Sequence, residues 1–301
     1  MAYSLQVQSV LYCNKKEALI KALESLYRAT QVNHESTAEI GEVRVCYGDA
    51  SPEPVFTDKE IADLNNRFGG VITVDYEYFN ENTGSAKGHN LLGEKCTSDY
   101  MLIMNPDVVV CPRVFASMMK PFMDPSLKAG MTEARQTPVE HPKEYSEKTG
   151  ETGWATTAFA IFSTEIFREL GGFDADTFFM YCDDLDFSWR VRMLGKKVYY
   201  CPDAVVFHAK TLSAKASWKP TNAEVYYSAE AAILMAYKWS NSSLCKKICK
   251  DYIASGDENL VRAVKHFEEL KANNKLPVQL DKQHKVAEFV GNYYTKHRFK
   301  L

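Results

Sequence analysis

Apolar and polar positions alternate in blocks along the first two thirds of the chain, and each block has the period of a strand or of a helix. The apolar run Leu5–Tyr12 precedes an amphipathic stretch, Lys15–Tyr27, whose apolar residues recur at helical spacing. Val71–Tyr76 is typical of a strand, Gly84–Cys96 of a helix, and Tyr100–Met104 of a fully apolar strand inside a parallel sheet. This alternation predicts an α/β fold: a mostly parallel sheet flanked by helices on both faces.

The pattern changes beyond about residue 210. Before that point, residues 134–152 have the composition of an exposed loop, and Lys197–Cys201 and Val205–His208 indicate two short strands. After it, helical periodicity appears near 222–240, 242–253, 257–272 and 281–295. We therefore expect an α/β domain over residues 1–215 and a helical C-terminal appendage over residues 216–301.

Composition narrows the class of protein. The 301 residues are 46% hydrophobic and 25% charged, and a formal net charge of −3 argues against a nucleic-acid partner. No apolar run approaches the length of a membrane span, and the N-terminus has no secretory pattern. The eight cysteines include no Cys-x-x-Cys pair, which favours buried, reduced thiols. We expect a cytoplasmic protein, whose basic closing segment Tyr293–Leu301 is either an exposed tail or a peripheral contact with the inner face of the membrane.

Carboxylates concentrate at two places. Asp183, Asp184 and Asp186 follow an aromatic run at the expected start of a helix, and Asp107 ends the apolar strand near residue 104. Carboxylates this dense repel one another, and folds tolerate that mainly where cation or proton chemistry uses them. With the later His208, these acids predict a metal–phosphate site with a separate general base.

The acid cluster lies within one long motif of defined spacing. It runs Gly171-Gly172-Phe173-Asp174 … Phe179-Met180-Tyr181-x-Asp183-Asp184-x-Asp186 … Arg190 … Gly195 … Pro202-x-Ala204 … His208. Three shorter motifs accompany it: Asn105-Pro106-Asp107, the Gly84–Asn90 loop and Tyr12-x-Asn14. Over about residues 5–210 the chain resembles the family 2 glycosyltransferases, which are inverting enzymes with a GT-A (Rossmann-like) fold. It is most similar to their rhamnosyltransferase-like branch, which builds bacterial surface polysaccharides.

The resemblance implies a divalent cofactor, Mn²⁺ or Mg²⁺, held by Asp107 and His208, with Asn105 where the family's motif has its first Asp. It also implies a nucleotide-diphosphate sugar bound by Tyr12, Asn14, Asp49, Ser51, Lys87, Gly88, Asn90 and Asn105. Three alternatives stay open from the residues alone. Asp107 could instead cap a helix or turn. His208 could be a histidine that ends a strand with its hydrogen bonds satisfied within the protein. Asp49 could belong to a simple Gly-Asp-x-Ser-Pro turn.

For the acceptor side, the resemblance places the general base in Asp183-Asp184. We assign the base to Asp184, with Asp183 contacting the acceptor or orienting its loop. Asp186 is expected to face Arg190, four residues on along one helix face. The substrate-binding candidates are Trp154, Phe179, Tyr181 and Arg190. The alternatives are a helix cap with a solvated face for the acids, and ordinary core packing for the aromatic residues.

The predicted function is that of an inverting, metal-dependent glycosyltransferase. It would move a sugar, L-rhamnose from dTDP-L-rhamnose, to a hydroxyl of a glycan or lipid-linked glycan. Two other functions compete with it: a nucleotidyltransferase, which also puts carboxylates and metal at the ends of a parallel sheet, and a non-catalytic module that binds a glycan or another partner on the same fold. The residues indicate neither the acceptor linkage nor the oligomeric state.

Overall fold

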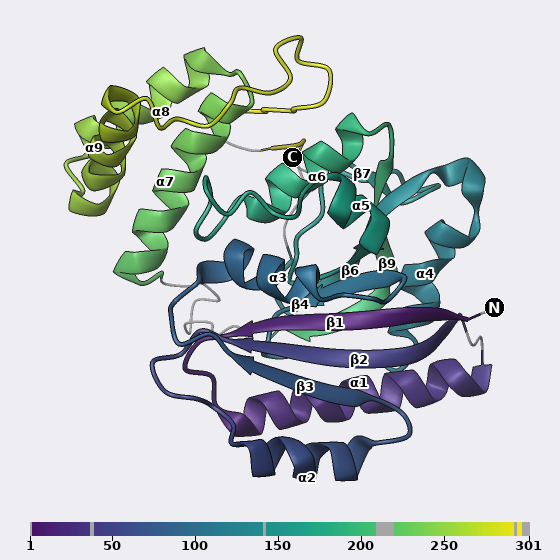
Figure 1. The fold of residues 1–301 in the computed structure, drawn as a ribbon. Coiled ribbons are helices and arrows are strands. Elements are labelled where there is room, and N and C mark those ends of the chain that lie inside the picture. The colour runs from purple at the N-terminus through teal and green to yellow at the C-terminus, as the bar shows by residue number, and fades with distance from the viewer. Residues whose placement is uncertain (1, 37–38, 141–142, 209–219, 292–293, 297–301) are drawn as a thin grey trace.

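A computed structural model describes the chain at residues 2–36, 39–140, 143–208, 220–291 and 294–296 (Figure 1). The first half contains β1 (Tyr3–Leu11), α1 (Lys16–Ser36), β2 (Ile40–Asp49), α2 (Asp58–Phe68), β3 (Thr73–Tyr78), α3 (Gly84–Glu94), β4 (Tyr100–Met104), β5 (Val108–Val110), α4 (Val114–Met123), the 3₁₀ turn η1 (Pro125–Leu127) and β6 (Ala129–Thr137). The second half contains β7 (Glu151–Thr152), β8 (Phe159–Ser163), α5 (Thr164–Glu169), α6 (Asp183–Met193), β9 (Lys197–His208), α7 (Asn222–Lys238), α8 (Ser242–Ser255) and α9 (Glu258–Ala272).

One mixed sheet organises the molecule. Its strands run in the order β3-β2-β1-β4-β8-β6-β9-β5, and β7 pairs with β9. β1 is parallel to both β2 and β4, and β6 is parallel to β9. β8 runs antiparallel between β4 and β6, and β5 runs antiparallel to β9. The mostly parallel sheet expected from the sequence is therefore confirmed, and the carboxyl ends of its parallel strands share one edge.

Helices cover both faces of this sheet, because alternate strand residues point to opposite sides. On one face, Leu5 and Val7 pack in a core with Leu19 and Leu23 of α1 and with Phe115 of α4. A second core on the other face joins strands β4, β6 and β8 to helices α3, α5 and α6. Figure 1 shows α1 and α2 below the sheet and α3, α5 and α6 above it. This arrangement confirms the predicted α/β class.

The C-terminal helices share a third core with the α/β part. Trp189 of α6 packs edge-on against Trp239, with ring centroids 5.1 Å apart. Phe178 and Leu185 join the same buried cluster as Ile233 of α7. The helices expected near 222–240, 242–253 and 257–272 are present as α7, α8 and α9. The expected boundary at 215/216 and most of the basic segment 293–301 lie outside the described residues.

Three expectations about elements are wrong. The segment near 281–295 forms no helix in its described part, because the Asp281 carboxylate accepts the backbone N–H groups of Lys285, Val286 and Ala287 in a local turn. β9 is one 12-residue strand instead of two, and the pairing of β6 with β9 shifts register beside Pro202, where a ladder hydrogen bond is lost. The expected loop over 134–152 begins later, because β6 continues to Thr137.

Within the part of the chain that the structure describes, no helix combines the length and the apolar character that crossing a bilayer requires.

Candidate active site

The end of β9 and the segment that follows β4 meet at the carboxyl edge of the sheet. β1 lies between β2 and β4, and such a reversal of strand order opens a crevice at the carboxyl edge of an α/β sheet. Asn105 and Asp107 directly follow β4, and His208 ends β9. Val108 of β5 is the antiparallel partner of His208, so the sheet itself brings Asp107 next to the histidine.

The His208 ring has a fixed orientation. Its Nε2 lies 3.4 Å from Asp107 Oδ1 and 3.2 Å from Asn105 Nδ2. Its Nδ1 lies 2.9 Å from Gln136 Oε1, and the Gln136 amide donates to Thr156 Oγ1 at 2.7 Å. Because Gln136 presents its oxygen to the ring, the network assigns the proton to Nδ1 and leaves a lone pair on Nε2. His208 is therefore a buried histidine with its ligating nitrogen aimed at Asp107.

This pair fits a divalent cation as a partial ligand set. A carboxylate oxygen beside an imidazole nitrogen suits a borderline ion such as Mn²⁺. Asp107 is 34% exposed, so its second oxygen remains accessible to a ligand from solvent. No cluster of three or more His, Cys, Asp or Glu side chains able to hold a metal occurs among the described residues. Any further ligands of a six-coordinate ion would come from phosphate oxygens and water.

The acid pair is placed by a sharp turn before α6. Tyr181 and Cys182 both have left-handed backbone angles, φ +69° and +57°, which non-glycine residues adopt at a cost and which recur at functional sites. α6 begins immediately afterwards, so Asp183 and Asp184 occupy its first turn. Asp183 is buried and Asp184 is half-buried. Burial, then the neighbouring Asp184 carboxylate, raises the pKa of Asp183 to about 7; burial also raises the pKa of Asp184.

The Gly84–Asn90 motif meets this acid pair. The Ser85 N–H donates to the Phe179 carbonyl at 3.1 Å, and the Ser85 hydroxyl bonds to Asp183 and opposes the rise in its pKa. Gly84 has φ +67°, and a Cβ there would lie 2.4 Å from the Phe179 carbonyl oxygen. Glycine is therefore required where α3 approaches the loop before α6. The structure brings together two motifs that are about 100 residues apart.

A buried ion pair lies beside Asp184 and was missed at the level of sequence. Lys143 Nζ contacts the Glu133 carboxylate, and both side chains are almost fully buried. The ammonium also donates to the Trp154 carbonyl at 3.0 Å and sits 4.1 Å from the Trp154 ring centroid. The Lys143 charge lowers the pKa of Asp184 against the larger effect of burial. Neither residue belongs to a recognisable motif: Glu133 lies on β6, and Lys143 lies ten residues later, after the strand has ended.

Arg190 makes several contacts within the fold. The expected pair with Asp186 is present, with Arg190 Nε 2.8 Å from Asp186 Oδ2. The guanidinium also donates to the carbonyls of Leu170 and Gly172 at 3.0 and 2.8 Å. Those contacts fasten the Gly-Gly turn to α6. The assignment of Arg190 to substrate binding stays a prediction.

Two residues expected to contact the nucleotide instead build a turn. Both Asp49 oxygens accept protein donors: Ser51 N–H at 2.9 Å, Val55 N–H at 2.7 Å and the Tyr76 hydroxyl. The Asp49 side chain is fully buried, which favours the simple turn over the expected contact with the nucleotide base. Ser51 Oγ accepts the Cys13 N–H at 2.8 Å and so ties this turn to the end of β1.

Helix α3 holds three further candidates, two of which are structural. Asn90 exchanges two hydrogen bonds of 2.8 Å with the backbone of Phe173, which anchors the Gly-Gly-Phe-Asp loop. A Cβ at Gly88 would lie 2.7 Å from Val10, so this glycine permits close packing of α3 on β1. These contacts favour packing roles for both residues, and their expected contacts with the nucleotide stay predictions. Lys87 is exposed and pairs with Glu81 at 2.7 Å.

The remaining candidates lie just after β1 and in the loop before α6. Tyr12 is 52% exposed beyond β1, and its N–H donates to Asn14 Oδ1 at 2.8 Å. Phe179 packs against Tyr227 of α7, with ring centroids 4.8 Å apart. Burial, then the Glu224 carboxylate, raises the pKa of Tyr181 to about 12. Phe179 and Tyr181 therefore lie between the acid pair and the C-terminal helices.

Comparison with solved structures identifies the architecture. No protein-family model and no curated protein sequence matches the chain. A mannosyltransferase, PcManGT from Pyrobaculum calidifontis, in complex with GDP-Man and Mn²⁺, superposes with a TM-score of 0.57 at 15% identity, over 91% of this chain and 81% of the other. GalNAc-T7 with UDP, GalNAc and Mn²⁺ superposes with a TM-score of 0.61 at 11% identity, over 92% of this chain. This chain spans only 56% of the GalNAc-T7 chain. The architecture of this chain is the GT-A glycosyltransferase fold.

Proposed function

We propose that the chain is an inverting, metal-dependent glycosyltransferase that transfers a sugar from a nucleotide-diphosphate donor to an acceptor hydroxyl. One observation carries the proposal: Asp107 and the oriented His208 meet at 3.4 Å on the carboxyl edge of the sheet, while a second pair of acids occupies the start of α6. The two clusters separate cation binding from proton transfer. The Mn²⁺ and nucleotide sugars in the compared structures support the same assignment.

Asp107 and His208 would hold the metal ion, which would neutralise the charge that develops on the departing diphosphate. His208 is ready to bind, because Gln136 fixes its Nδ1 proton and leaves Nε2 as a ligand. An ion at Nε2 would take the place of the Asn105 contact. Asn105 would therefore release the His208 nitrogen when the ion binds, and this role does not require a carboxylate at position 105.

The general base in this proposal is Asp184. Attack from the face opposite the diphosphate requires one carboxylate that accepts the hydroxyl proton, an effect worth about 10²–10⁴-fold. Asp184 is more exposed than Asp183, so an acceptor hydroxyl reaches it more readily, and burial raises its pKa and so makes the carboxylate more basic. Asp183 is buried and bonded to Ser85, so we give it the role of orienting the loop.

The finer specificity rests on the sequence resemblance. We assign L-rhamnose from dTDP-L-rhamnose as the transferred sugar and a glycan or lipid-linked glycan hydroxyl as acceptor, in surface polysaccharide synthesis. The reaction would take place in the cytoplasm, with peripheral contact at the inner face of the membrane. Asp49 no longer contributes to this choice, since its oxygens are committed to the turn.

Product analysis tests the proposal. The protein is incubated with Mn²⁺ and, in separate reactions, dTDP-rhamnose, GDP-mannose or a UDP-sugar, with water as the acceptor. We expect slow release of a nucleoside diphosphate from one donor, and loss of that release in His208→Ala. In a parallel reaction with a nucleoside triphosphate and a sugar 1-phosphate, release of pyrophosphate would point to a nucleotidyltransferase instead. No release from any donor, combined with no nucleotide binding, would favour a non-catalytic module.

A further inference from the structure

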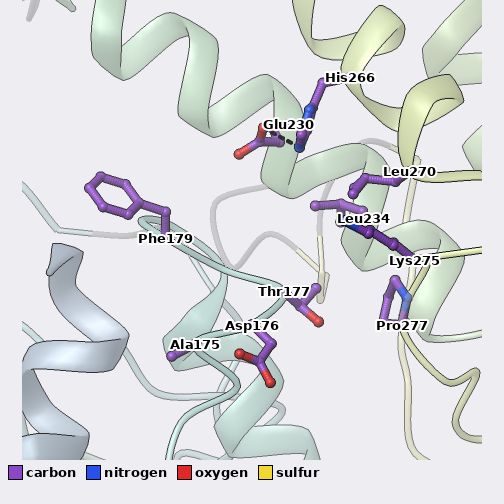
Figure 2. A pocket seen from close by; sticks show the side chains of 10 residues that line it. All are labelled: Ala175, Asp176, Thr177, Phe179, Glu230, Leu234, His266, Leu270, Lys275 and Pro277. Atoms are coloured by element: carbon purple, nitrogen blue, oxygen red, sulfur yellow. Dashed lines mark ion pairs between the residues drawn. The ribbon is translucent and has the colours of Figure 1, made fainter. Parts of the chain in front are cut away.

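A cavity of about 240 Å³ opens between the loop that precedes the acid pair and the C-terminal helices. Asp176, Thr177 and Phe179 line it from the loop, and Glu230, His266 and Lys275 line it from α7, α9 and the segment that follows (Figure 2). Of these six residues, only Phe179 was singled out by the sequence. The donor chemistry proposed above uses none of the polar ones.

The polar groups on the helix side of the cavity are held in place by neighbouring side chains. Glu230 accepts the Tyr226 hydroxyl at 2.6 Å, and His266 Nε2 lies 3.5 Å from the same oxygen, the pair marked in Figure 2. The Tyr226 ring in turn lies 4.0 Å from the guanidinium carbon of Arg262. Glu230 is only 13% exposed, so its second oxygen is held in a fixed place beside the cavity. Such preorganisation lowers the entropy cost of binding a ligand.

The loop side is braced as well. Asp174, two residues before Asp176, forms an ion pair of 2.6 Å with Lys238 of α7. The Phe179 carbonyl accepts the Ser85 N–H at 3.1 Å. By contrast, the Asp176 carboxylate and the Lys275 ammonium have no hydrogen-bond or ion-pair partner within the described ranges of the chain. The cavity thus combines a rigid frame with one acceptor and one donor that are available to a ligand.

We propose that this cavity binds a single neutral sugar ring of the acceptor glycan; that the sugar belongs to an acceptor rests on the proposed transferase function. Carboxylates and an ammonium make strong, charge-assisted hydrogen bonds with hydroxyls. Phe179, Leu234 and Leu270 offer apolar surface to the C–H face of the ring. A phosphate would face the carboxylates of Asp176 and Glu230, and an apolar ligand would bury charges without partners. The volume lies just below the range of about 300–1,000 Å³ for drug-sized ligands, so it suits one ring.

The position of the cavity gives the C-terminal helices a function. The loop of Asp176 and Phe179 continues through the left-handed pair Tyr181–Cys182 into Asp183 and Asp184. A sugar bound by α7 and α9 is therefore held by the chain segment that also carries the base. Acceptor recognition would then depend on α7 and α9, whereas donor binding depends on the sheet edge.

Saturation-transfer NMR on the full chain tests this site. The probes are the methyl glycosides of rhamnose, mannose, glucose, galactose and N-acetylglucosamine, without donor or metal. We expect at least one glycoside to bind, and Asp176→Asn and Lys275→Met each to weaken it about tenfold, the effect of losing one charge-assisted hydrogen bond. Asp63→Asn on α2 and Lys21→Met on α1 are matched controls, which should leave the affinity unchanged.

The outcomes separate this proposal from the donor chemistry. Each variant is also checked for its thermal shift with a nucleoside diphosphate and Mn²⁺, which should equal that of the unmodified protein and which verifies folding. Absence of binding by all five glycosides, or binding that neither Asp176→Asn nor Lys275→Met weakens, overturns the sugar site while leaving the transferase proposal intact. Glycoside binding in a protein that binds no nucleotide would support the cavity and contradict the transferase.

Discussion

Lys238 of α7 and Asp186 of α6 form a buried ion pair with 2.6 Å between Nζ and Oδ1. The same ammonium lies 2.6 Å from Asp174, and the Trp239 indole donates to Asp186 at 3.0 Å. Arg190 occupies the other oxygen of Asp186. These contacts fasten the last residue of α7 to both the helix and the loop that present the acid pair. The C-terminal helices are therefore a structural part of the candidate site.

Lys238→Met should strongly destabilise the protein. The substitution leaves Asp186, which is fully buried, with one fewer countercharge, and removing one partner of a buried pair costs about 3–5 kcal/mol. Urea denaturation measures the loss. Lys247→Met is the matched control, because its pair with Asp251 is exposed and should contribute less than about 1 kcal/mol. Equal losses in the two variants would show that the buried network does not hold α7 in place.

Gln136→Leu should weaken metal binding without removing a ligand. The Gln136 carbonyl oxygen fixes the His208 proton on Nδ1, and loss of such an outer partner typically costs about 10–100-fold in metal affinity. Calorimetric titration with Mn²⁺ in the presence of a bound nucleoside diphosphate measures the change. Gln136→Glu keeps an acceptor for Nδ1–H and should retain most of the affinity. A result in which both variants bind Mn²⁺ equally well would contradict the assigned orientation of the ring.

Substitutions of Asp183 and Asp184 should have different effects on turnover. Asp184→Asn removes the proposed base, so turnover should fall by about 10²–10⁴-fold while donor affinity is kept. Asp183→Asn retains a hydrogen-bonding side chain beside Ser85 and should lose less. Steady-state release of nucleoside diphosphate and equilibrium binding of the donor give the two quantities. Unchanged turnover in Asp184→Asn would remove Asp184 as the base.

The raised pKa of Asp183 predicts a specific dependence of stability on pH. The folded state binds this proton more tightly than the unfolded state does, because burial disfavours the carboxylate. The contribution is therefore fully present below the ordinary carboxyl pKa of about 4 and is lost as the pH rises through about 7, the folded value. We expect Asp183→Asn to gain stability relative to the unmodified protein as the pH rises from 5 to 8. Urea midpoints at several pH values measure this difference, and a constant difference would contradict the raised pKa.

The alternating pattern of the chain was sufficient to predict the sheet and its flanking helices. Asp107 and His208, which the sequence assigned to one site, lie 3.4 Å apart at the carboxyl edge of the sheet, and the place of the acid pair in that site stays a prediction. The last segment was predicted wrongly because its apolar residues have helical spacing, while Asp281 bonds to three backbone N–H groups and so stabilises a turn. Hydrophobic periodicity does not reveal side-chain bonds to the backbone that compete with a helix.

The roles of single polar residues were harder to predict than the fold. Asp49 and Asn90 occupy positions where a ligand contact and a loop anchor have the same sequence signature, and the structure commits both to the backbone. Glu133 and Lys143 could not be found, because their pairing is a tertiary contact that hydrophobic periodicity does not encode. The role of Gln136 in orienting His208 became apparent only from the strand register, which places the two side chains together.

A thermal-shift screen tests the central claim most directly. Melting is followed with dTDP, UDP or GDP, and with CMP as a control, each with and without Mn²⁺, for the unmodified protein, Asp107→Asn and His208→Ala. Since a ligand that binds only the folded state raises the melting temperature, we predict a rise with one nucleoside diphosphate that requires Mn²⁺ and disappears in both variants. A rise that is independent of Mn²⁺, or that survives both substitutions, would contradict a metal-dependent donor site at Asp107 and His208.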